Sequence, residues 1–229
     1  MERTHLTTAY SLISELFLYP EDRDTALVEA GMVRLGAVAE LREPLEAFLA
    51  APAATSAMEY VATLELAPPV PLYLGSYLYE EPQSCRGAAM SGRNGYMLEL
   101  ANIYRHFGVE LTGGEMADFV PIIVEFLGIS LERGDRDRIG LRRYLVETLL
   151  INGIESLLSA LRKYESPYAH LVEALRVALT EDIARMADGP KWQPPADIEP
   201  TDEDHPSVPA AIRGLTATER ATPENGVEL

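Results

Sequence analysis

The sequence predicts an all-α protein: a single-domain bundle of about ten helices over residues 1–187, then a Pro-rich acidic tail, residues 188–229, that is disordered or loosely docked. Apolar residues recur three or four positions apart through most of residues 1–187. No stretch alternates apolar and polar residues between hairpin turns, so a sheet is not expected. The tail is set apart because seven of the sixteen prolines lie in it, with few large apolar residues.

The N-terminal helices are each bounded by helix-breaking residues. The first is indicated by apolar residues at helical spacing and is ended by a proline: Leu6, Tyr10, Ile13, Phe17 and then Pro20. Gly31 and Gly36 are expected to loosen the join between the next two helices, and Pro68-Pro69 ends the one after them. These three shorter helices are Asp24–Ala30, Glu40–Leu49 and Met58–Leu66.

The middle of the chain predicts two helices after a compact segment, residues 71–87, that is rich in Pro, Gly and aromatic residues. The first of these helices carries an apolar face from Met97 to Phe107 and ends at Gly108. Thr112 and Glu115 have capping-box spacing, which predicts that the next helix begins near Glu115. That helix is apolar nearly all round, so we expect it to be the central buried helix.

The C-terminal helices follow the same periodicity. Leucines and isoleucines from Leu141 to Leu161 predict a long amphipathic helix. Ser166-Pro167 is an N-cap followed by a proline suited to the first helical position. The last helix extends from there to Met186, and Gly189-Pro190 ends it.

Composition limits the classes of function. A formal net charge of -17 disfavours binding to nucleic-acid phosphates or anionic membranes and favours a basic partner, although acidity that serves only solubility is the simpler alternative. The single cysteine, Cys85, excludes an internal disulfide and indicates a reducing compartment. The N-terminus shows no signal peptide, and the apolar stretch Phe119–Leu131 is too short to span a bilayer, so we expect a cytoplasmic protein without membrane insertion.

No pattern of catalytic residues is present. The four histidines lack Cys, Asp or Glu partners at metal-site spacing, so no metal site is expected. Cys85 has neither a nearby His base nor a CxxC partner, and phosphate-binding glycine motifs are absent. We therefore expect no catalytic residues, no permanently bound cofactor and no enzymatic activity, whereas a small helical hydrolase would need clustered acids on facing helices.

The middle block contains the candidate binding residues. Tyr73 and Tyr77 lie close together, and Arg86 follows them. Glu115 and Asp118 are expected on one face of the predicted helix start, where they either stabilise that start or meet a ligand. A carboxylate on an apolar helix must be paired, protonated or at a groove, so Glu125 is either in an internal salt bridge, with Arg86 as one candidate partner, or a ligand contact.

The same block resembles a known family, the delta-subunit (NarJ-type) chaperones of molybdenum oxidoreductases, which are relatives of the TorD and DmsD maturation proteins. The likeness is carried by Leu18-Tyr19-Pro20, Pro71–Tyr77, Arg86–Met90, Tyr104–Gly108, Glu115–Pro121 and Glu125–Leu127. The chain differs from the family's Glu-Leu-Pro-Asp-His-Leu-Pro motif in two places: Met116-Ala117 replaces Leu-Pro, and Phe119 replaces the His. A role that depends on that imidazole does not transfer to this chain.

The resemblance implies an all-helical chaperone that binds the N-terminal or twin-arginine leader segment of a molybdenum oxidoreductase catalytic subunit. Such a chaperone retains its client until the molybdenum cofactor is inserted, and it contacts that cofactor transiently at most, through the client. The resemblance also implies a peptide groove, which we expect at Tyr73, Tyr77, Arg86, Glu115, Asp118, Phe119 and Glu125.

Several features stay open at this point. The segment Pro71–Tyr77 favours an exported client of the dimethyl-sulfoxide-reductase type, with membrane-bound respiratory nitrate reductase as the alternative. A third possible function for the chain is that of a structural subunit in a stable oxidoreductase complex. A homodimer is one possible assembly, because helical relatives of this kind exchange segments between protomers.

Overall fold

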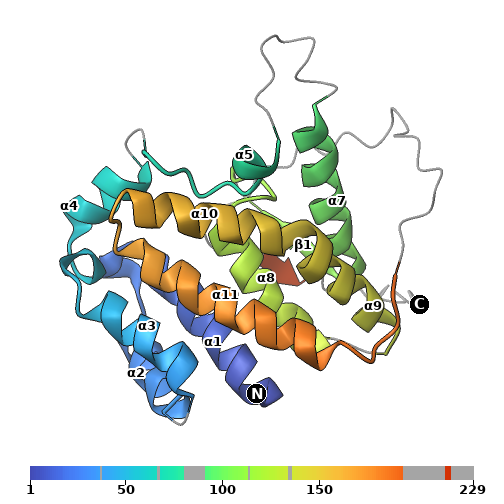
Figure 1. The fold of residues 1–229 in the computed structure, drawn as a ribbon, viewed down its shortest axis with the longest axis horizontal. Helices are drawn as coiled ribbons and strands as arrows, with labels where there is room; N and C mark the ends of the chain where they lie inside the picture. The colour runs from blue at the N-terminus through green and yellow to red at the C-terminus, as the bar shows by residue number, and fades with distance from the viewer. Residues whose placement is uncertain are drawn as a thin grey trace, which may run out of the picture.

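A computed structural model describes residues 1–36, 38–65, 68–79, 91–112, 114–133, 136–192 and 215–217. The all-α prediction is confirmed (Figure 1). The α-helices are α1 (Arg3–Leu16), α2 (Thr25–Arg34), α3 (Ala39–Leu49), α4 (Ala57–Tyr60), α5 (Gly75–Leu78), α7 (Gly92–His106), α8 (Val120–Arg133), α9 (Arg136–Tyr144), α10 (Ile151–Lys163) and α11 (Tyr168–Arg185). Short 3₁₀ turns at Pro20–Asp22 and Pro52–Ala54, π-helical turns at Val61–Glu65 and Leu145–Leu150, and strands β1 (Val109–Leu111) and β2 (Leu215–Ala217) complete the description.

Helix α1 is central to the bundle, since it packs against α8, α11 and α2 (Figure 1). Its apolar residues recur at the predicted spacing and all face inward: Leu6, Ala9, Tyr10, Leu12, Ile13 and Leu16 are buried. The helix ends at Leu16, and a 3₁₀ turn starts at Pro20. The predicted first helix is therefore confirmed.

Gly31 has a different role from the one predicted. It lies inside α2, so it does not loosen the join to α3. A Cβ atom at this position would lie 2.6 Å from Leu12 Cγ, which means that the glycine lets α2 approach α1 closely. Asp24 caps the same helix by accepting hydrogen bonds from the amides of Ala26 and Leu27, at 3.0 Å each.

The predicted start of the central helix is wrong. Helix α8 begins at Val120 and not near Glu115, so Glu115 and Asp118 lie in the loop before it and do not share a helix face. Pro121 is the second residue of α8, where a missing amide removes no intrahelical hydrogen bond. The prediction that this helix is buried holds, because Val120, Ile123 and Leu127 are almost inaccessible to solvent.

The long amphipathic helix is confirmed and contains a π-helical turn. Helices α9 and α10 are joined through Leu145–Leu150 into one continuous helical segment. Within the described residues, Ile139–Lys163 is the one helix that is long and apolar enough to cross a bilayer by length and composition. Half of its most apolar window is buried inside the protein, as is also common for a core helix.

A small sheet corrects the expectation that none forms. Strand β1 pairs antiparallel with β2, and Val109 lies opposite Ala217. The three-residue strands are too short to show an alternating pattern in the sequence. Within the predicted tail, the Trp192 ring contacts Tyr144 at a centroid distance of 4.7 Å. Residues 193–214 and 218–229 of the predicted tail lie outside the described part of the chain.

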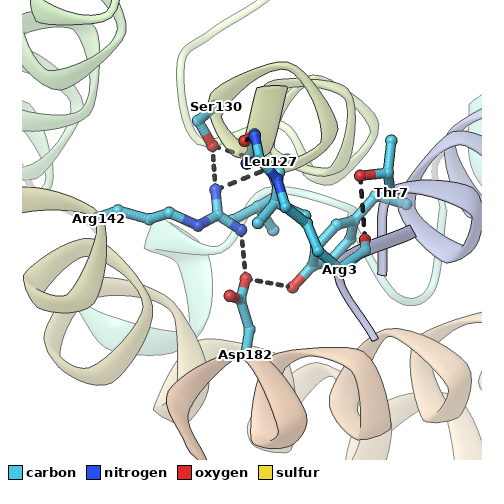
Figure 2. Close-up of polar contacts among 8 residues, drawn as sticks. Arg3, Thr7, Leu127, Ser130, Arg142 and Asp182 are labelled. Carbon is cyan, nitrogen blue, oxygen red and sulfur yellow. Dashed lines mark hydrogen bonds and ion pairs between the residues drawn. The ribbon is translucent and has the colours of Figure 1, made fainter. Parts of the chain in front are cut away.

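A buried polar network ties four helices together (Figure 2). Arg142 of α9 forms an ion pair with Asp182 of α11 and donates hydrogen bonds to Ser130 Oγ and the Leu127 carbonyl of α8. Tyr10 of α1 donates a 2.9 Å hydrogen bond to the same Asp182 oxygen. Since both charged side chains are at most 5% exposed, each depends on the other for compensation of its charge.

Candidate functional site

The Pro71–Tyr77 segment is joined to the start of α8 by backbone hydrogen bonds. Leu74 N donates to the Asp118 carbonyl at 3.0 Å, and Val120 N donates to the Leu72 carbonyl at 2.9 Å. Tyr73 and Phe119 form an isolated antiparallel bridge between these two donors. Two segments that resemble the family motif are thereby placed side by side, although about forty residues separate them.

Asp118 is fully buried beneath this pairing. Its Oδ2 atom accepts a hydrogen bond from Gly75 N at 3.0 Å and one from Arg93 Nε at 3.2 Å. Arg93 Nη2 lies 3.1 Å from the same oxygen, so the two side chains also form an ion pair. The carboxylate therefore holds α5 and α7 against the start of α8, and a peptide could reach it only after local rearrangement.

Gly75 is required for this contact. A Cβ atom at position 75 would lie 2.6 Å from Asp118 Oδ2 and 2.7 Å from Arg93 Cγ. These distances are shorter than any normal contact, so only glycine lets the backbone amide approach the carboxylate.

Tyr73, Glu115 and Phe119 form the outer, half-exposed layer over Asp118. Tyr73 Oη donates a 2.7 Å hydrogen bond to Glu115 Oε2, and the Tyr73 and Phe119 ring centroids are 5.2 Å apart. The Arg93 guanidinium carbon lies 5.8 Å from the centre of the Tyr73 ring. Desolvation, followed by the hydrogen bond to Glu115, raises the pKa of Tyr73 well above its usual value, so this hydroxyl remains a donor at neutral pH. We call Tyr73, Arg93, Glu115, Asp118 and Phe119 the Tyr73 cluster.

Tyr77 lies beside the cluster on α5 and braces the segment from within. Its hydroxyl donates a 2.8 Å hydrogen bond to the Pro71 carbonyl, and burial raises its pKa to about 12. Burial likewise raises the pKa of Tyr168 to about 12 and raises the pKa values of Tyr10 and Tyr104 further.

These tyrosines predict a sensitivity to alkaline pH. An unfolded tyrosine loses its proton near pH 10, whereas the buried ones keep theirs, so the unfolded state binds fewer protons above that pH. The free energy of unfolding is expected to be independent of tyrosine titration below about pH 9.5 and to fall steadily above about pH 10. Urea unfolding over this range, with tyrosinate absorbance recorded in parallel, measures both quantities. Equal stability on the two sides of pH 10 would contradict the expectation.

Two predicted site residues remain, Arg86 and Glu125. Arg86, with its predicted pairing to Glu125 or to the other carboxylates, lies outside the described residues. Glu125 lies one and a half turns into α8, where it lines a cleft against α1. Of the seven residues predicted as one groove, Tyr73, Glu115, Asp118 and Phe119 lie together with Tyr77 beside them, and Glu125 lies apart from them in the cleft against α1.

The cleft between α1 and α8, which we call the α1–α8 cleft, has a volume of about 400 Å³. Three carboxylates line it, from Glu15, Glu125 and Glu132, together with the apolar side chains of Leu18, Leu27 and Ile129. Thr7, Ser11, Ser14 and Gly128 are the other described residues of the lining, and Glu15 Oε1 accepts a hydrogen bond from Asp24 N at its rim. Its volume is within the range of sites that hold small molecules or a few side chains.

Sequence reasoning missed three residues of these sites. Arg93 stands two residues after the α7 N-cap Ser91, and nothing in the pattern there distinguishes a buried ion-pair partner from a surface arginine. The sequence pattern places Glu15 and Glu132 on the polar face of an amphipathic helix, where a side chain is expected to be exposed to solvent. Only the packing of α1 on α8 brings them to one cleft.

The described side chains of both locations are aromatic groups, apolar groups, hydroxyls and carboxylates, with Arg93 beneath the Tyr73 cluster. Within the described ranges, no group of three His, Cys, Asp or Glu side chains is arranged to hold a metal ion. The Tyr73 cluster contains a hydroxyl whose pKa is raised, which suits hydrogen bonding and not proton transfer at neutral pH. What these surfaces present is partly exposed aromatic groups and carboxylates, which suit contact with another chain.

Comparison with known proteins gives one family. A family model described as nitrate reductase delta subunit matches residues 34–188. The matched region runs from the end of α2 to just beyond α11 and includes the whole Tyr73 cluster. A search of curated proteins finds no match.

Proposed function

Because the chain belongs to the nitrate reductase delta subunit family, we propose that it is a maturation chaperone for the catalytic subunit of a molybdenum oxidoreductase. It binds the N-terminal or twin-arginine leader segment of that subunit and holds back export or membrane attachment until the molybdenum cofactor is inserted. The observation that carries this proposal is the family match over 155 residues, counted from 34 to 188 inclusive. Since insertion precedes export, the proposal places the chaperone in the cytoplasm.

Charge supports a basic segment as the ligand. The chain has a formal net charge of -17, and leader segments of the twin-arginine type are basic and amphipathic. Opposite charge accelerates the encounter between such partners, and this acceleration becomes smaller as salt is added. A helix or an extended peptide with an apolar face would then be held by partly exposed apolar groups.

The Tyr73 cluster supports the proposal as one contact region. Phe119 and Tyr73 are half-exposed, and Met116 beside them is 39% exposed, so an apolar side chain of the client has a surface to cover. Glu115 provides the accessible carboxylate of this region, while Asp118 and Arg93 support it from beneath. Phe119, which stands where the family has a histidine, contributes only packing.

The client is proposed to be an exported enzyme of the dimethyl-sulfoxide-reductase type, and respiratory nitrate reductase is the second candidate because the matching family bears its name. Producing the chain with each catalytic subunit discriminates between them. The true client should reach full molybdenum content only when the chaperone is present, and the other subunit should be unaffected.

The decisive experiment compares three forms of the client: cofactor-free, cofactor-loaded, and cofactor-free without its N-terminal segment. The chaperone is expected to co-purify with the first form alone. Co-purification with the loaded enzyme in fixed stoichiometry would instead identify a structural subunit. Retention of the truncated form would refute recognition through the N-terminal segment.

A further inference from the structure

A carboxylate on α7, Glu99, is flanked by aromatic side chains from three other segments. Tyr144, at the end of α9, donates a 2.7 Å hydrogen bond from its hydroxyl to Glu99 Oε1. The Trp192 ring, which follows α11, lies on the Tyr144 ring with 4.7 Å between the two centroids. Burial, and then the charge of Glu99, raise the pKa of Tyr79, so the hydroxyl that follows α5 also lies within the field of this carboxylate. We call Tyr79, Glu99, Tyr144 and Trp192 the Glu99 site.

The negative charge of Glu99 is not neutralised by an ion pair. Its hydrogen-bond donor is a neutral phenol, and among the described side chains no Lys, Arg or His pairs with it. The residues three and four positions away on α7, where a helical partner would stand, are all uncharged: Gly95, Tyr96, Asn102 and Ile103. Since Glu99 is also partly exposed, its charge is available to a ligand.

The Tyr79 ring is fixed against α7. A Cβ atom at position 92 would lie 2.7 Å from Tyr79 Cδ1, so Gly92 lets the ring lie directly on the helix. The ring also packs on the buried ring of Tyr96, with 5.5 Å between the centroids. Gly92, Tyr96 and Glu99 are four and three residues apart, so Tyr79 lies along the helix face that carries the carboxylate.

Trp192 is carried by a turn that Arg143 fixes. The Arg143 Nη1 atom donates to three backbone carbonyls of the turn after α11, the shortest contact being 2.8 Å to Ala187. The Nε atom of the same side chain lies 2.9 Å from Glu147 Oε1 and forms an ion pair with it. The cation nearest to Tyr144 in the sequence is thus engaged elsewhere and does not satisfy Glu99.

The chemistry of the Glu99 site suits a cation on an alkyl stem. Tyr144 and Trp192 are half-buried and Tyr79 is 36% exposed, so each ring has a surface that a ligand can reach. The electron-rich face of an aromatic ring attracts a guanidinium or ammonium group, most strongly for Trp, and the carboxylate adds an acceptor of full charge. An anion would be repelled, and a purely apolar group would remove Glu99 from water without a partner.

From this geometry we infer that the Glu99 site binds an Arg or Lys side chain of a peptide, with the cation at Glu99 and the alkyl stem on the rings of Tyr144 and Trp192. The inference rests on the proposed function, since the N-terminal segment of the client is the basic peptide that supplies the cation. Arg93 of the Tyr73 cluster stands six residues before Glu99 on α7, a rise of about 9 Å. About three residues of an extended peptide span that distance, so one segment reaches both regions.

The test uses the full chain and the fluorescence of Trp192, which is its only tryptophan and therefore reports on this site alone. The probe is the synthetic peptide acetyl-Ala-Leu-Arg-Ala-Leu-amide. The comparison peptide carries citrulline, an uncharged side chain of nearly the same shape, in place of arginine. The arginine peptide is expected to change the Trp192 emission and to bind about 10-fold more tightly than the citrulline peptide, and added salt should reduce this difference.

Two variants with matched controls locate the contact. Glu99→Gln keeps an acceptor for the Tyr144 hydroxyl and removes the charge, whereas Glu40→Gln removes the same charge from an exposed position on α3. The first should bind the arginine peptide about 10-fold more weakly and no better than the citrulline peptide, and the second should bind as the unaltered chain does. Calorimetry on Trp192→Leu, with Tyr164→Leu as the control at an exposed ring, should show weaker binding in the former alone.

Thermal unfolding of every variant checks that the fold is retained. Equal affinity for the arginine and citrulline peptides, an unchanged Trp192 emission, or full affinity in Glu99→Gln would each overturn the inference. The proposed function is judged separately, by co-purification of the unaltered chain with the cofactor-free client. Retention of that client without arginine binding at Trp192 overturns the Glu99 site and leaves the chaperone role standing, while loss of both overturns both.

Discussion

Replacing Arg142 with methionine is expected to lower the free energy of unfolding by about 3–5 kcal/mol, because the change leaves the Asp182 carboxylate buried without its counter-charge. Tyr10 would then be the remaining donor to Asp182 from the network, and the Leu127 carbonyl and Ser130 hydroxyl would each lose a hydrogen bond. Asp182→Leu should cost a similar amount, since it isolates the guanidinium instead.

The matched control removes the whole network at once. Tyr10→Phe/Arg142→Met/Asp182→Leu leaves no isolated charge, and a buried ion pair replaced by apolar side chains is often close to neutral in stability. Urea unfolding followed by circular dichroism should therefore show a loss in the combined variant that is much smaller than the sum of the two single losses. Single losses below about 1 kcal/mol would show that solvent reaches this network and that the charges are not isolated.

Gly75→Ala is expected to have the second large effect, because the added methyl group would overlap the carboxylate of Asp118 and the side chain of Arg93. Relief requires that α5 move away from Asp118, which breaks the hydrogen bond from Gly75 N to that carboxylate. The expected loss is about 1–3 kcal/mol in stability, as for other overpacked interiors. Client binding through Tyr73 and Glu115 should weaken as well, because the same movement displaces the Pro71–Tyr77 segment.

Gly95→Ala is the control for this prediction. Gly95 lies inside α7, and a Cβ atom there would meet no atom within 4 Å. Alanine is favoured over glycine inside a helix by about 0.5–1 kcal/mol, so this variant should be slightly more stable than the unaltered chain. Opposite shifts in the urea midpoints of the two variants would confirm the assignment. A neutral Gly75→Ala would mean that α5 is free to move and that Asp118 does not hold it.

Much of the helical framework could be predicted from local pattern. The spacing of apolar residues in α1, the proline after it and Gly108 after α7 all act within a few residues of their own position, and the structure confirms them. Gly108 has a φ of 71°, which glycine adopts without strain at a helix end. The start of α8 was mispredicted because the capping-box spacing at Thr112 and Glu115 is also compatible with a loop, and pairing of residues 118–120 with 72–74 decides between them.

For the candidate site, too, some features could be predicted from the sequence and others depend on the tertiary structure. The fold class, the acidic charge, the absence of catalytic motifs and the likeness of Pro71–Leu127 to delta-subunit chaperones could all be predicted from the sequence, because each depends on composition or on residues near one another in the chain. The tertiary structure shows that Asp118 is a buried partner of Arg93 and that Glu125 and Glu132 of α8 line one cleft with Glu15 of α1. Those contacts join residues that are far apart in the chain, and their geometry depends on how whole helices pack, which no local pattern encodes.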